Sequence, residues 1–235
     1  MIKEVKNVKF DYKGIIDLSD DYKERIRNYW EQLQEESDLL KEGRILVVSN
    51  FTFSNDDYSL ELKETTFSHY MYERKYKNID LKCMFSGAYI VTSDNYVVTV
   101  LNNAYKGKNY EELNLPGGMA DSKDIINNEY YDLINLKREF MEELGFDLND
   151  SNFEINLKYI KCPSNSEDSF GYPIGTIYEV KTTYSKEQIL DMFNNNERDI
   201  EIKKLVFFNK DNYKDIYNYE YKKGYMPELF ERLFS

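Results

Sequence analysis

Residues 138–146 of the chain read Arg138-Glu139-Phe140-Met141-Glu142-Glu143-Leu144-Gly145-Phe146. On a helix with about 100° per residue, three carboxylates of this stretch share one face, at positions i, i+3 and i+4: Glu139, Glu142 and Glu143. Like charges at this spacing destabilise a helix by roughly 0.2–0.5 kcal/mol per pair. A divalent cation reverses that cost, because hard oxygen ligands suit Mg²⁺ or Mn²⁺ that also carries water and phosphates. The stretch therefore predicts a metal site on a helix.

The same helix has an apolar side, which we expect to face the core: Leu133, Leu136, Phe140 and Leu144. Gly145 is suited to the left-handed residue that ends a helix. An acidic triplet alone is typical of a solvated helix face in an acidic chain. The full pattern also has an Arg before the first Glu and a Gly-apolar pair at its end, and it arises by chance in on the order of one chain in ten thousand. We therefore favour the metal site over the solvated face.

The composition excludes several classes of protein. The chain has 235 residues, with 31 Lys+Arg against 43 Asp+Glu and a net charge of −12. Aromatic residues make up 16% of it, which argues against intrinsic disorder. Because phosphate backbones are bound by clustered Lys and Arg, the negative charge argues against a nucleic-acid partner.

Cysteine and histidine are scarce, which excludes further kinds of site. The single histidine is His69, and the two cysteines are Cys83 and Cys162, far apart in the chain. This inventory excludes a structural zinc site and argues against a Ser-His-Asp triad. We expect both cysteines to be small buried hydrophobic residues in a reducing compartment.

Long apolar segments are also missing from the sequence. The start, MIKEVKNVKF, has no apolar region of a signal peptide, and no stretch approaches 18 apolar residues. We therefore expect a cytoplasmic protein with no membrane partner.

Periodicity and turn residues predict interleaved helices and strands. In the first half we expect a helix at 18–42, strands at 45–53 and 58–63, and a hairpin formed by 88–92 and 96–101. A tight turn at 114–118 is then followed by a long helix that ends at about residue 144. Residues 64–78 are ambiguous between helix and strand. The second half is expected to contain three strands and two helices: 153–161, 174–181 and 200–208, with helices at 185–193 and after Pro227. This order favours an α+β or mixed α/β fold.

The box at 138–146 resembles the second half of the Nudix box, whose family consensus is GX5EX7REUXEEXGU, with U an apolar residue. The upstream segment Leu115-Pro116-Gly117-Gly118 resembles the loop before the family's catalytic helix, with the consensus glycine at Gly118. The resemblance covers residues 83–235, about two thirds of the chain. It implies a mixed-sheet sandwich between helices. Residues 1–82 lie outside the family's core, and the helix and strands expected there predict a small α/β arm.

The spacing departs from the consensus. Gly118 and Arg138 lie 20 positions apart (138 − 118), against 14 in the consensus, so six residues are inserted in the loop or at the start of the helix. Counting back from Arg138, the first consensus Glu would be residue 130, which is Tyr130. We expect Glu129 or Asp132 to take over its role, which in the family is mainly to support the Arg.

The resemblance also implies roles for individual residues. Glu142, Glu143 and the carbonyl of Gly118 would bind Mg²⁺ or Mn²⁺, and Glu139 would bind a metal or orient and deprotonate the attacking water. Arg138 would hold a carboxylate in place, so the expected catalytic residues are Glu139, Arg138 and Glu142. Family members often use a further Glu from a later loop as base, and the candidates here are Glu167 and Glu197.

The leading hypothesis is a metal-dependent Nudix hydrolase that cleaves the phosphoanhydride of a nucleoside diphosphate linked to another group. The layout, with an N-terminal module and altered box spacing, is similar to that of Nudix enzymes acting on nucleoside diphosphate sugars. ADP-ribose, a dinucleotide or a nucleoside triphosphate stays open as substrate. The alternative is a non-catalytic Nudix-fold module that senses a nucleotide. The three intact carboxylates speak against it and the inserted residues speak for it.

Overall fold

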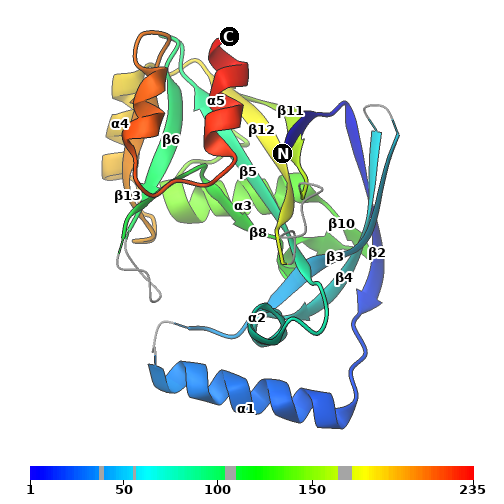
Figure 1. Ribbon diagram of the computed structural model, residues 1–235. Helices are drawn as coiled ribbons and strands as arrows, with labels where there is room; N and C mark the ends of the chain where they lie inside the picture. The colour runs from blue at the N-terminus through cyan, green and yellow to red at the C-terminus, as the bar shows by residue number, and fades with distance from the viewer. Residues whose placement is uncertain (37–39, 55–56, 104–109, 164–170) are drawn as a thin grey trace.

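The computed structural model describes residues 1–36, 40–54, 57–103, 110–163 and 171–235 (Figure 1). Across these ranges, no helix combines the length and the apolar character that crossing a bilayer requires. The helices are α1 (Asp20–Glu36), α2 (Phe67–Tyr76), α3 (Asp132–Leu144), α4 (Lys186–Asn195) and α5 (Met226–Phe234), with short 3₁₀ helices η1 (Ser122–Asp124) and η2 (Tyr213–Asn218).

The strands follow in chain order. The first group is β1 (Ile2–Glu4), β2 (Asn7–Ile15), β3 (Arg44–Ser54), β4 (Asp57–Thr66), β5 (Lys82–Val91) and β6 (Val97–Asn102). The second group is β7 (Glu112–Asn114), β8 (Gly117–Met119), β9 (Ile125–Ile126), β10 (Glu129–Tyr130), β11 (Phe153–Lys161), β12 (Ile174–Thr182) and β13 (Ile202–Phe208).

Strand β5 is the central strand of the main sheet and pairs with four other strands. The sheet has the order β1-β11-β12-β5-β3-β4-β2, with β6, β7, β8 and β13 joined off this path. β5 pairs in parallel with β12 along most of its length, and antiparallel with β3 near its start, β8 in its middle and β6 at its end. The box loop (residues 115–118), whose glycines begin β8, is therefore fixed to the centre of the sheet.

The sheet is packed between helices on both faces (Figure 1). Because side chains alternate along a strand, Ala88 and Ile90 of β5 pack with α3 and α4, while Tyr89 packs with α5. The expected mixed-sheet sandwich between helices is confirmed. Cys83 and Cys162 are free and buried, as expected.

Several local expectations need correction. Two N-terminal strands, β1 and β2, precede the first helix and were not expected. Helix α1 ends by Glu36 in the described part, and residues 40–42 are not helical, although a helix over 18–42 was expected. The ambiguous segment 64–78 divides into the end of β4 and helix α2, which Thr66 caps through its hydroxyl.

The segment between the box loop and α3 also differs from the expectation. The long helix expected after residue 118 is shorter, because η1 and the two-residue strands β9 and β10 come first. Asn127 and Asn128 both have positive φ (51° and 63°), which suits a tight two-residue hairpin turn. The insertion is therefore a small hairpin in front of the helix.

The arm and the rest of the chain share strand pairs. β1 pairs with β11, so residues 2–4 lie beside residues 159–161, and β3 pairs with the start of β5. The division into an arm at 1–82 and a domain at 83–235 stays a prediction.

Candidate active site

The glycine pair of the loop allows close backbone contact. Gly117 has φ +126°, and a Cβ there would overlap the carbonyl oxygen of Ser86 and the backbone of Gly87 on β5. A Cβ on Gly118 would overlap the carboxylate of Glu139. The sequence needs glycine at both positions because one glycine lies against a strand and the next lies against the first carboxylate of the box.

Helix α3 is held by its apolar side and by Asn135. Leu136, Phe140 and Leu144 are fully buried, as expected, whereas Leu133 is 36% exposed and the expectation that it faces the core is wrong. Leu133 is the second residue of α3, in the first helical turn, and the buried apolar residues begin only at Leu136. The buried side chain of Asn135 accepts a hydrogen bond from the Ser86 amide (3.2 Å) and donates one to the Met119 carbonyl (3.1 Å).

The end of α3 follows the expected pattern. Gly145 has φ +70°, and its amide donates to the Met141 carbonyl at 3.1 Å. The position therefore requires a residue that tolerates the left-handed conformation.

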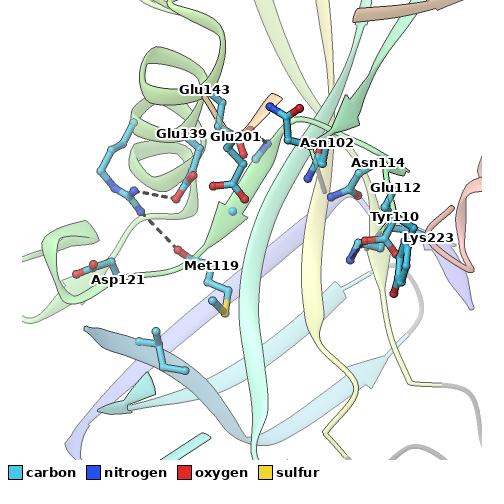
Figure 2. A pocket seen from close by; sticks show the side chains of 15 residues that line it. Asn102, Tyr110, Glu112, Asn114, Met119, Asp121, Glu139, Glu143, Glu201 and Lys223 are labelled. Atoms are coloured by element: carbon cyan, nitrogen blue, oxygen red, sulfur yellow. Dashed lines mark hydrogen bonds and ion pairs between the residues drawn. The ribbon is translucent and has the colours of Figure 1, made fainter. Parts of the chain in front are cut away.

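Glu139 and Glu143 line one cavity of about 340 Å³, together with Gly117 and Gly118 (Figure 2). The Gly117 amide donates to Glu143 Oε2 at 2.8 Å. Burial raises the pKa of Glu139 to about 7, although the charge of Arg138 opposes the shift. Burial also raises the pKa of Glu143 well above its usual value, and the nearby charges of Glu139 and Asp199 add to the effect. Burial in the cavity therefore favours the protonated form of both carboxyl groups.

Arg138 joins the carboxylates of α3 to η1. Its Nη1 lies 2.8 Å from Glu139 Oε1 and 3.2 Å from Glu142 Oε2. Its Nε and Nη2 each donate to a different oxygen of Asp124, both at 3.1 Å, and the Asp124 side chain is fully buried. Such a two-pronged pair fixes both the position and the plane of a guanidinium.

The expectation that Glu129 or Asp132 supports the arginine is therefore wrong. Glu129 accepts a hydrogen bond from Tyr131 on the β9–β10 hairpin, and Asp132 accepts one from Tyr178 of β12. Both carboxylates are held by tyrosines, so Asp124 is the one that reaches Arg138.

The signal for Asp124 is present in the sequence when the spacing is counted from the other end. Asp124 lies six positions after Gly118, which is the GX5E spacing of the consensus with Asp in place of Glu. All six extra residues then lie between Asp124 and Arg138, where the structure has the β9–β10 hairpin. Counting back from Arg138 crosses the six inserted residues, so it leads to Tyr130 and not to Asp124.

We expect Asp124→Asn to release Arg138. Arg138 keeps its contacts with Glu139 and Glu142, but its buried Nε and Nη2 donors lose the carboxylate that both of them reach, and an unsatisfied buried donor costs about 1–3 kcal/mol in the free energy of unfolding. Thermal and denaturant unfolding measure the change, and Glu129→Gln is the control that should alter stability by less than about 0.5 kcal/mol. Equal effects of the two substitutions would contradict the assignment of Asp124.

The structure separates the remaining candidates. Glu142 has a side chain that is 51% exposed; it contacts Arg138 but does not line the cavity. Glu197 is exposed, and Glu167 lies outside the described residues. Glu201, which the sequence analysis missed, lines the cavity with Glu139 and Glu143 (Figure 2), and burial raises its pKa. It immediately precedes β13, and nothing in its local sequence marks it.

The donor set fits a hard divalent cation in its chemistry. Over the described ranges, no three Asp, Glu, His or Cys side chains are arranged as a ready-made metal cage. Glu139, Glu143 and the Gly118 backbone nevertheless lie around one cavity. Burial raises the pKa of both carboxyls and so disfavours their charged forms, which a bound cation would stabilise.

No family model matches the chain, and no curated protein matches it. Solved structures do match. One is a Nudix hydrolase from Nitrosomonas europaea, 14% identical over 65% of this chain and 88% of its own, with TM-score 0.45. Another is Tm1382, a candidate Nudix hydrolase, 14% identical over 81% of this chain and 98% of its own, with TM-score 0.47. Both identities are far below 25% and both TM-scores are below 0.5.

A third match is a bifunctional NMN adenylyltransferase/ADP ribose pyrophosphatase from Francisella tularensis, solved with AMP and a Mn ion. It is 15% identical over 71% of this chain and 46% of its own, with TM-score 0.44. At these identities and TM-scores the matches carry no argument about activity, which depends on the residues of the site.

Proposed function

We propose that this chain is a Nudix-type hydrolase that uses Mg²⁺ or Mn²⁺ to cleave the phosphoanhydride of a nucleoside diphosphate linked to another group. The observation that carries the proposal is the cavity in which Glu139 and Glu143 meet the backbone of Gly118, with Arg138 held by buried Asp124. A merely solvated helix face would have neither the burial nor the arginine support.

The residues divide the chemistry between them. Glu139, Glu143 and the Gly118 carbonyl would hold the metal in the cavity, and Glu142, which pairs with Arg138 outside the cavity lining, would join them by turning its exposed side chain toward the metal. The metal would neutralise the diphosphate and lower the pKa of the attacking water. Glu139 or Glu201 accepts the proton of that water, and Arg138 keeps Glu139 in position. Lys223, at the other end of the cavity in Figure 2, is placed to bind a phosphate oxygen.

The proposal is tested by incubating the protein and Mg²⁺ with a panel of nucleoside diphosphate sugars, ADP-ribose, dinucleotides and nucleoside triphosphates. We expect a conjugate to give two monophosphate products, each identified by mass and by phosphatase-coupled phosphate release. Silence across the whole panel, on folded protein, would favour the second candidate, a nucleotide sensor. The inserted β9–β10 hairpin beside the site is the observation that favours a sensor.

Metal binding provides a separate test. We expect calorimetry or Mn²⁺ relaxation to detect a divalent cation whose affinity falls about tenfold or more in Glu142→Gln and in Glu143→Gln, because each substitution removes a charged ligand. Glu24→Gln, an exposed glutamate of α1, is the control and should bind as the wild type does. Unchanged affinity in both box variants would place the metal elsewhere.

A further inference from the structure

A second cavity, of about 550 Å³, is also lined by the loop that precedes α3, through Leu115, Gly117 and Gly118. It shares part of its lining with the carboxylate cavity: Asn114, Gly117, Gly118, Met119 and Lys223. A conjugate whose diphosphate lies beside Glu139 and Glu143 can therefore extend its other arm past the loop into this second space.

The two cavities have opposite charge. The first is lined by five carboxylates against two cations, Arg138 and Lys223; the carboxylates are Glu112, Asp121, Glu139, Glu143 and Glu201. Three cations and no described carboxylate line the second: Arg74, Lys161 and Lys223. In a chain with net charge −12, this separation is a specific feature of the site. It points to an anionic group in the second cavity.

Lys161 is the deepest of these cations. It is the last residue of β11, only 8% exposed, and its Nζ donates to the Pro173 carbonyl at 2.7 Å. Its Nζ lies over the rings of Phe85 and Tyr172 (both 5.6 Å) and Tyr225 (5.9 Å). Within the described ranges, no carboxylate forms an ion pair with it. Three ring faces and one carbonyl thus hold a buried ammonium for which the described residues supply no paired carboxylate.

The neighbouring groups do not supply that charge. Arg74 donates to the Tyr70 hydroxyl (3.2 Å), and Lys223 pairs with Glu112 (2.9 Å), so Lys223 is the only one of the three with a described carboxylate. Burial lowers the pKa of Lys161 to about 8, with the charge of Lys223 also lowering it. The ammonium would regain stability beside a bound anion.

We propose that the second cavity binds a phosphate monoester on the arm of the substrate that lies away from the scissile diphosphate, with Lys161 and Arg74 as its cationic ligands. This inference rests on the proposed function. An anion in this cavity would lie beside the ammonium of Lys161, which the three rings hold in place. The preferred substrates are accordingly nucleoside diphosphate conjugates that carry an additional phosphate.

The test measures binding without turnover. Equilibrium dialysis or calorimetry in EDTA compares two matched pairs of probes, NADP⁺ with NAD⁺ and coenzyme A with dephospho-coenzyme A, which differ by one phosphate monoester. For at least one pair we expect the phosphorylated member to bind about tenfold more tightly or better. Lys161→Met and Arg74→Met should each reduce that preference, the first to about twofold or less, and Lys161→Arg should retain most of it because the charge is kept.

Lys158→Met is the control, since Lys158 lies on the same strand but pairs with Glu179 outside the cavity. The control should leave the preference unchanged. No preference in the wild type for either pair, or an unchanged preference in Lys161→Met, would overturn the inference. If the phosphorylated probes bind more tightly but neither the panel nor the four probes are hydrolysed with Mg²⁺, this cavity is supported and the proposed function is contradicted. If hydrolysis occurs and no preference is found, the proposed function is supported and this inference is overturned.

Discussion

Glu143→Gln is expected to lower kcat about 10²-fold or more while leaving the protein folded. The buried carboxylate has a raised pKa and accepts the Gly117 amide, which a glutamine oxygen can also accept. Neutralising it should therefore preserve or raise the melting temperature of the metal-free protein. Turnover should fall because charge stabilisation by a metal is worth several kcal/mol in the transition state.

The measurement pairs a melt, with and without Mg²⁺, with turnover on the best substrate of the panel. Glu24→Gln, far from the site on α1, controls for the loss of one negative charge and should retain full turnover. If Glu143→Gln turns over substrate as fast as the wild type, the carboxylate has no part in the reaction.

Phe140→Ala on the opposite side of α3 should behave in the reverse way. Phe140 is fully buried in the core formed with β5, β6, β12 and α4. Its truncation should cost about 3–5 kcal/mol in the free energy of unfolding, from lost burial and from the cavity left behind. Activity per folded molecule should stay near that of the wild type.

Denaturant unfolding measures this cost, and Met141→Ala supplies the control on the same helix. Met141 is 46% exposed, so its truncation should change stability by about 0.5 kcal/mol or less. Comparable losses in the two variants would contradict the orientation of α3.

The box helix could be predicted from sequence because its signals are local. The buried stripe of α3 repeats at helical spacing, and Gly145 ends the helix in the left-handed conformation that a glycine permits. The capping box of Ser185 and Gln188 likewise predicts the start of α4, and the structure contains both of its hydrogen bonds. For such elements a few neighbouring residues determine the backbone.

Contacts made across the chain could not be predicted in this way. β1 is three residues long and gains its partners only by pairing with β11, so its own sequence carries little strand signal. The sequence of β11 alternates polar and apolar residues in the ordinary way, so nothing in it marks Lys161. The lysine is buried because it contacts the rings of Phe85 on β5, Tyr172 and Tyr225. Glu201 reaches the carboxylate cavity only because the sheet brings β13 to β6.

Asp124 is an intermediate case. Its spacing from Gly118 is local information, but the inserted hairpin separates it from Arg138, and only the fold shows that the two side chains meet. An insertion between two parts of a motif preserves the spacing within each part. Counting from both ends of such a motif would have located the residue.

The most direct test of the central claim is turnover of the wild type on the best substrate of the panel, measured as Mg²⁺ is titrated from EDTA to millimolar concentration. A hydrolase that uses Glu139, Glu142 and Glu143 as metal ligands should be inactive in EDTA, regain full activity with Mg²⁺ or Mn²⁺, and release two monophosphates. Turnover that persists unchanged in EDTA would contradict a metal-dependent site on α3.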